Sequence, residues 1–166
     1  MFDLCIDYVT KYPFPGEEAV VGFEARLGIS LPEDYKEFIR SYHAGYFGER
    51  SSFKLGHITK EQTKQYGSVR MSWMYGFTSH VGYNIVESHP SYDLGEPWNK
   101  NYLEIGADEG GNSVFIGLSR ENYGHIFWID HEYDYTDDPN EDEPRGEKDM
   151  VHLADSFTQW VSSFKE

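Results

Sequence analysis

The chain has almost no cysteine, and it has no long apolar run. Its 166 residues include one cysteine, Cys5, which has no second cysteine with which to form an internal disulfide. The first residues, MFDLCIDYV, lack the basic start and long apolar core of a signal peptide. No window approaches the roughly 18 apolar residues of a membrane-spanning helix. We therefore expect a cytoplasmic protein that makes no contact with a membrane.

Basic residues are also scarce. The chain has 14 Lys and Arg against 29 Asp and Glu, a formal net charge of −15. The excess is concentrated, because residues 1–83 hold 10 acids and 9 bases whereas residues 84–166 hold 19 acids and 5 bases. Nucleic-acid binding needs clustered Lys and Arg against the phosphate backbone, so this balance argues against it. A cationic partner is the natural complement.

The common motifs of enzyme and cofactor sites are missing. There is no HExxH, GxSxG or GxxxxGK motif, and no two of the seven histidines are spaced i, i+4. We therefore predict no catalytic residue, no cofactor site, no metal site and no enzymatic activity. A hydrolase that uses carboxylates and a metal is the minor alternative.

One acidic run, residues 130–149, has ten acids and two bases and no apolar periodicity, which predicts a solvated loop. It partly fits the spacing of an EF-hand, but Tyr135 stands where the loop needs glycine, and Pro139 falls inside it. Two alternatives stay open: weak cation binding by the run, and a cation held by Asp130, His131, Glu132 and Asp134. The run supplies the candidate partner-binding residues Asp130, Glu132, Asp134, Asp137, Asp138, Glu141, Asp142 and Glu143.

Helical spacing occurs near both ends of the chain. Residues 17–28 place an apolar residue on one face at i, i+3 and i+7 and end at Gly28. Residues 30–43 predict a second helix with a capping box from Ser30 to Glu33, ending near Gly45. A closing helix is predicted from the spacing of Leu153, Phe157, Trp160, Val161 and Phe164, with Ser156 and Gln159 as a capping box.

Alternating apolar residues indicate strands between these helices. Residues 102–107, 114–118 and 124–130 predict three antiparallel strands, a meander, while residues 52–55 and 72–77 give weaker strand signals. The stretch Asp108-Glu109-Gly110-Gly111-Asn112 precedes a strand rather than a helix, which argues against a phosphate site. We therefore predict that Gly110, Gly111 and Asn112 form a structural turn. Glu104 is expected to be an exposed charge opposite the apolar face.

Four segments in order, LGISLPEDYKEFIRSYHAGYF, YLEIGADEGGNSVFIGL, GHIFWIDHE and HLADSFTQWVSSF, resemble the SUKH superfamily. This superfamily includes bacterial toxin-immunity proteins and fungal regulators of cell-wall synthesis. The resemblance implies one α+β domain over residues 1–166: a mostly antiparallel sheet with a central meander, packed against N-terminal and C-terminal helices. In the family, the residues that match Leu31, Pro32 and Tyr35 open a helix, and those that match Gly111 and Asn112 lie at a strand turn.

The resemblance also implies a function. Bacterial members bind and neutralise a cognate toxin, often a nuclease, delivered between competing cells, so the expected partner is a basic protein toxin. The alternative is a non-enzymatic intracellular adaptor or regulator of the same fold. Neither the toxin nor the oligomeric state follows from the sequence.

Overall fold

The computed structural model describes residues 8–48, 51–55, 67–80, 82–88, 101–131 and 150–164, and the other residues lie outside the description. The elements are β1 (Tyr8–Tyr12), α1 (Glu17–Leu27), α2 (Glu33–Tyr42), β2 (Ala44–Phe47), β3 (Ser52–Phe53), β4 (Val69–Met74), α4 (Ile85–Ser88), β5 (Tyr102–Asp108), β6 (Ser113–Gly117), β7 (Ile126–Ile129), β8 (Val151–Ala154) and α6 (Phe157–Ser162).

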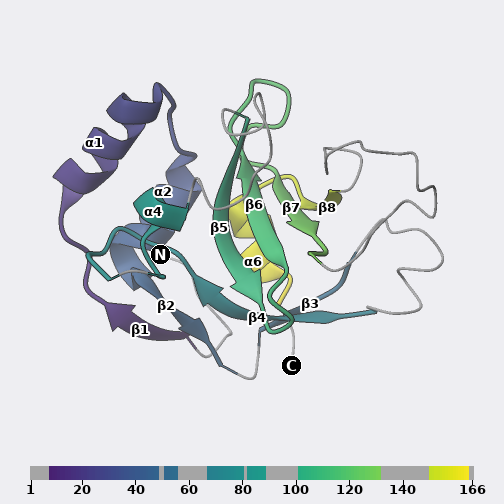
Figure 1. Ribbon diagram of the computed structural model, residues 1–166. Helices are drawn as coiled ribbons and strands as arrows, with labels where there is room; N and C mark the ends of the chain where they lie inside the picture. Colours follow the sequence, from purple (N-terminus) through teal and green to yellow (C-terminus); the bar gives the residue numbers. More distant parts are fainter. Residues whose placement is uncertain are drawn as a thin grey trace, which may run out of the picture.

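The described strands form one sheet, in which neighbouring strands run antiparallel. Its order is β1-β2-β4-β5-β6-β7-β8, and β3 pairs with β4 beside this path. Strands β5, β6 and β7 are consecutive neighbours, so the predicted meander is confirmed (Figure 1). Helix α6 lies behind β5 and β6, and α1 and α2 lie toward the β1 side (Figure 1). This arrangement confirms the α+β fold class.

Aromatic side chains join α2 and α6 to each other and to strands β1 and β3. The Phe157 ring of α6 lies 5.1 Å from the ring of Tyr35 and 5.0 Å from that of Phe38, both on α2. Asp34 adds a polar link, because its Oδ2 accepts hydrogen bonds from the backbone N and the Oγ1 of Thr158. The N-terminal and C-terminal helices therefore pack against each other as well as against the sheet.

The start of α2 differs from the prediction. Pro32 is the N-cap, and no side chain caps the helix, so the capping box from Ser30 to Glu33 is wrong. The helix ends at Tyr42 with His43 as C-cap, close to the predicted end, and Gly45 lies within β2. A Cβ on Gly45 would lie 2.3 Å from the carbonyl oxygen of Val9, so glycine is needed here to let β1 approach β2.

The closing helix is shorter than predicted. Leu153 lies in β8, which pairs with β7, and α6 begins at Phe157. The spacing from Leu153 to Phe157 is compatible with a helix, but pairing of residues 151–154 with β7 satisfies their backbone groups in a strand instead. Ser156 is the N-cap, as predicted, and its hydroxyl accepts from the backbone N of Gln159.

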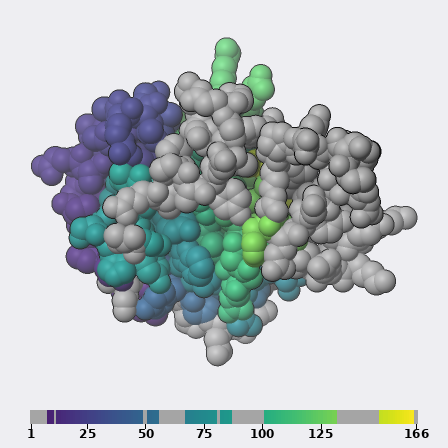
Figure 2. Space-filling model, viewed as in Figure 1, coloured from purple at the N-terminus to yellow at the C-terminus, as the bar shows by residue number. Residues whose placement is uncertain are grey.

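In the space-filling view, the purple surface of the N-terminal elements adjoins the teal surface around α4 (Figure 2). Helix α1 ends at Gly28 as predicted, and its Val20 and Phe23 are buried.

Within the described part of the chain, no helix is both long and apolar enough to cross a membrane.

Candidate partner-binding site

The acidic run connects β7 to β8, and the structure describes only its two ends. Asp130 and His131 follow β7 directly, and Met150 precedes β8. Asp130 is buried, with 2% of its surface exposed, so its carboxylate is not part of the accessible surface. The other seven candidate partner-binding acids lie outside the described residues.

The predicted turn lies beside the first end of this run. Ser113, which follows the turn, pairs with Ile129 near the end of β7, so the β5–β6 turn and the β7–β8 connection share one end of the sheet. Gly111 has a φ of 84°, in the left-handed region that favours glycine. Its backbone N donates to the carbonyl of Asp108 at 3.1 Å, which closes the turn. The structural turn at Gly110, Gly111 and Asn112 is therefore present.

The turn also contains a buried polar network that its sequence does not reveal. Asp108 is completely buried, and its Oδ1 accepts from the backbone N of Asn112 at 2.9 Å. Its Oδ2 accepts from Asn112 Nδ2 at 2.9 Å and from Trp128 Nε1 at 2.8 Å. Buried carboxylates are costly unless hydrogen-bonded, and here three donors compensate. The network thus ties the β5–β6 turn to β7.

Asn112 extends the network to the start of the acidic run. Its Oδ1 accepts from the backbone N of His131 at 3.0 Å and lies 2.8 Å from His131 Nδ1. The His131 ring also lies against Gly111, whose Cβ position would be 3.6 Å from Cε1. One ring nitrogen of His131 therefore already contacts protein, and the cation site of Asp130, His131, Glu132 and Asp134 stays untested because Glu132 and Asp134 lie outside the description.

The second end of the run is fixed by apolar packing. Met150 packs against a small cluster of Tyr102, Phe115 and Ile129, on the face of the meander opposite the main core. His131 and Met150, the described residues on either side of 132–149, are thus both held by contacts with the meander.

Glu104 belongs to this same face, and its expected exposure is wrong. Strand β5 is central rather than at an edge, and Glu104 is only 6% exposed. Burial raises the pKa of its carboxyl to about 7, although hydrogen bonds from Ser113 and Tyr75 lower it in part. Ser113 Oγ donates to Glu104 Oε1 at 2.7 Å. Alternation within β5 placed Glu104 on the correct face, but it could not show that this face is also covered.

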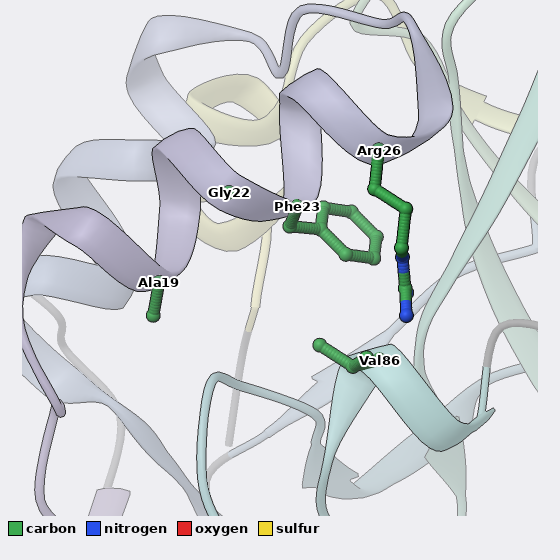
Figure 3. Close-up of a pocket in the computed structure, with 5 residues that line it drawn as sticks. All are labelled: Ala19, Gly22, Phe23, Arg26 and Val86. Carbon is green, nitrogen blue, oxygen red and sulfur yellow. The ribbon is translucent and has the colours of Figure 1, made fainter.

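A shallow depression between α1 and α4 is a second candidate surface. Phe23 and Arg26 extend from α1 toward Val86 of α4, with Ala19 and Gly22 completing the wall (Figure 3). The Arg26 guanidinium lies 5.7 Å from the centre of the Phe23 ring. The depression has a volume of about 160 Å³, which is smaller than the roughly 300 Å³ of the smallest typical small-molecule sites. It therefore does not fit a sizeable ligand.

Three possible metal ligands lie close together beside the paired strands β7 and β8, although no metal site was predicted. His125 precedes β7, while His152 and Asp155 lie in and just after β8. One ligand atom from each lies within 4.8 Å of the others. The histidines are 27 positions apart in sequence, so only strand pairing shows their proximity.

Residues 15–163 match the SMI1 / KNR4 family (SUKH-1). The chain belongs to this family. The SUKH-1 match spans the sheet from β2 to β8 together with α1, α2 and α6, and β1 precedes it. No curated protein matches the sequence.

The residues that carry the resemblance to SUKH-1 lie where it implied. Pro32 is the N-cap residue of α2, Leu31 and Tyr35 are buried, and Gly111 and Asn112 lie at a strand turn. SUKH-1 membership supports an immunity-protein or SMI1-like fold in general, and such proteins are generally non-enzymatic.

Proposed function

We propose that this SUKH-1 protein is a cytoplasmic immunity protein that binds and neutralises a basic, nuclease-type toxin through the acidic run between β7 and β8. The observation that carries the proposal is the concentration of ten acids in one connection between adjacent strands. The seven candidates are Glu132, Asp134, Asp137, Asp138, Glu141, Asp142 and Glu143.

The positions of the two ends support this role. His131 is hydrogen-bonded to the buried Asn112, and Met150 packs against Tyr102, Phe115 and Ile129, so the two residues that flank 132–149 are both held by the meander. A connection that is fixed at both ends loses less conformational entropy on binding than a free tail.

Charge supports a basic partner. A nuclease holds the phosphate backbone with clustered Lys and Arg, and an acidic surface complements that same patch. Opposite charge of this kind speeds association most at low salt, because screening weakens attraction beyond roughly 10 Å at 0.1 M ionic strength. We therefore expect the rate of complex formation to fall steeply as salt is added.

The test uses the toxin encoded beside this gene and two charge-matched triple variants. One reverses Asp138, Glu141 and Asp142 to lysine; the control reverses Glu18, Glu37 and Glu121, which are exposed on α1, α2 and the β6–β7 turn. Both raise the formal charge by six, from −15 to −9. We expect the first variant to lose about tenfold or more in association rate, and the control to lose much less.

Equal losses in both variants would show that only net charge matters and would reject the run as the contact. Absence of any complex with the native chain would reject the immunity function. In that case, recovery of a stable complex with another cellular protein would support the adaptor alternative.

A further inference from the structure

We propose that His125, His152 and Asp155 form a binding site for one divalent transition-metal ion of the Zn²⁺ class. Two imidazoles and one carboxylate suit Zn²⁺, Co²⁺ or Ni²⁺ better than Mg²⁺ or Ca²⁺, which prefer oxygen ligands alone. Three protein ligands leave a fourth position open to water or to a group from a partner.

The distances between ligand atoms suit a shared ion. His152 Nε2 lies 3.2 Å from Asp155 Oδ1. Ligand bonds of roughly 2.0–2.1 Å in a tetrahedral site place neighbouring ligand atoms about 3.3 Å apart. This pair is therefore already at a metal-site separation, and a ligand atom of His125 lies within 4.8 Å of both.

The surroundings of His152 Nε2 also favour a metal ion. The Nε2 atom of His152 is shielded from solvent and makes no hydrogen bond. Asp155 Oδ1 is close enough to this atom for an ion pair, at 3.2 Å, but it is not aligned for a hydrogen bond. A metal ion would occupy the axis of the nitrogen lone pair, so a second ligand of that ion necessarily lies off that axis. A buried nitrogen without a hydrogen bond calls for an explanation, and an ion shared with the two neighbouring ligands provides one.

The strands and Phe127 hold the two imidazoles in place. Phe127 pairs with His152 across β7 and β8, and its ring centre lies 5.4 Å from that of His152 and 6.4 Å from that of His125. The two imidazole centres are 5.3 Å apart. His152 is the ligand that lies in a strand, and its packing against Phe127 reduces the freedom that its ring loses on binding.

An ion at this position would join β8 to its neighbour. Strand β8 is the last strand of the described sheet order, and Asp155 lies between β8 and α6. Binding to the folded state alone stabilises it by mass action, so the ion should raise the melting temperature. None of the three ligands belongs to the acidic run.

The experiment titrates Zn²⁺ into the chelator-treated full chain by calorimetry, with excess Mg²⁺ present to occupy acidic surface. We expect one equivalent to bind, and His125→Gln, His152→Gln and Asp155→Asn each to weaken binding by about tenfold or more. His80→Gln is the matched control, because it removes an exposed histidine stacked on Tyr12. Asp155 has a side chain 71% exposed, so its variant should fold normally.

Substituted Co²⁺ provides a second measurement, because a four-coordinate ion absorbs visible light much more intensely than the six-coordinate ion in water. We expect that spectrum in the native chain and in His80→Gln, and its loss in the three ligand variants. Unchanged Zn²⁺ affinity in those variants would overturn the proposal. So would binding abolished by reversing Asp138, Glu141 and Asp142, since the acidic run would then hold the ion.

Discussion

The buried carboxyl of Glu104 should make this protein less stable as the pH rises toward neutrality. Burial raises its pKa from 4.5 to about 7 in the folded protein, whereas the unfolded chain exposes the group to water. Between these values the folded state binds more protons than the unfolded state, so the free energy of unfolding falls with rising pH. The contribution is fully present below about pH 4.5 and is lost as the pH passes through about 7.

The magnitude follows from the pKa difference. A difference of about 2.5, at about 1.36 kcal/mol for each pH unit, amounts to roughly 3 kcal/mol lost between pH 4.5 and 8. Glu104→Gln removes the titration and keeps an oxygen that accepts from Ser113 Oγ. We therefore expect the variant to match the native protein near pH 4.5 and to exceed its stability by up to about 3 kcal/mol at pH 8.

The assay is urea denaturation of both proteins at several pH values from 4.5 to 8. Other titrating groups affect both proteins alike, so the difference between the two curves isolates Glu104. Glu109→Gln is the control, because that glutamate lies in the same hairpin but is exposed and paired with Arg70. Native and Glu104→Gln curves that stay parallel across this range would refute the reasoning.

Three further substitutions test the turn, its network and the helix contact. Gly111→Val should cost about 1–3 kcal/mol in urea denaturation through its φ of 84° and not through crowding, so Gly111→Asn should cost less; equal costs would contradict this. Asp108→Ala should cost about 3 kcal/mol or more, because three donors lose their acceptor, with the neighbouring exposed Glu109→Ala as a near-neutral control. Asp34→Ala should cost about 1 kcal/mol and speed hydrogen exchange at the Thr158 amide, and an unchanged exchange rate would reject the bond between α2 and α6.

Local periodicity was sufficient to predict most elements. The alternation of residues 102–107 and 114–118 predicted β5 and β6, because successive side chains of a strand point to opposite faces of the sheet. The boundary of α6 was wrong because Leu153 fits a helical spacing with Phe157, while pairing with β7 holds it in a strand. The spacing of apolar residues within one segment does not show whether a distant strand will pair with it.

The polar contacts of the site were much less predictable. Asp108 has the composition of an exposed turn residue, and only the register of β7 brings Trp128, 20 positions later, within reach of its carboxylate. Glu104 alternates as an outward residue, yet the outer face of the meander carries its own apolar cluster. His125 and His152 likewise meet only through the pairing of β7 with β8. Each case depends on contacts between strands distant in sequence.

The same turn connects the fold to the proposed function. Asp108 accepts from Asn112 and Trp128, and Asn112 accepts from His131 at the start of the acidic run. A buried network with all three of these donors satisfied resists local opening, because each broken bond would leave a buried polar group unpaired. His131, the last described residue before the acids of 132–149, is therefore held by the same network that closes the β5–β6 turn. If the proposed partner neutralises those acids, its binding does not require the turn to change.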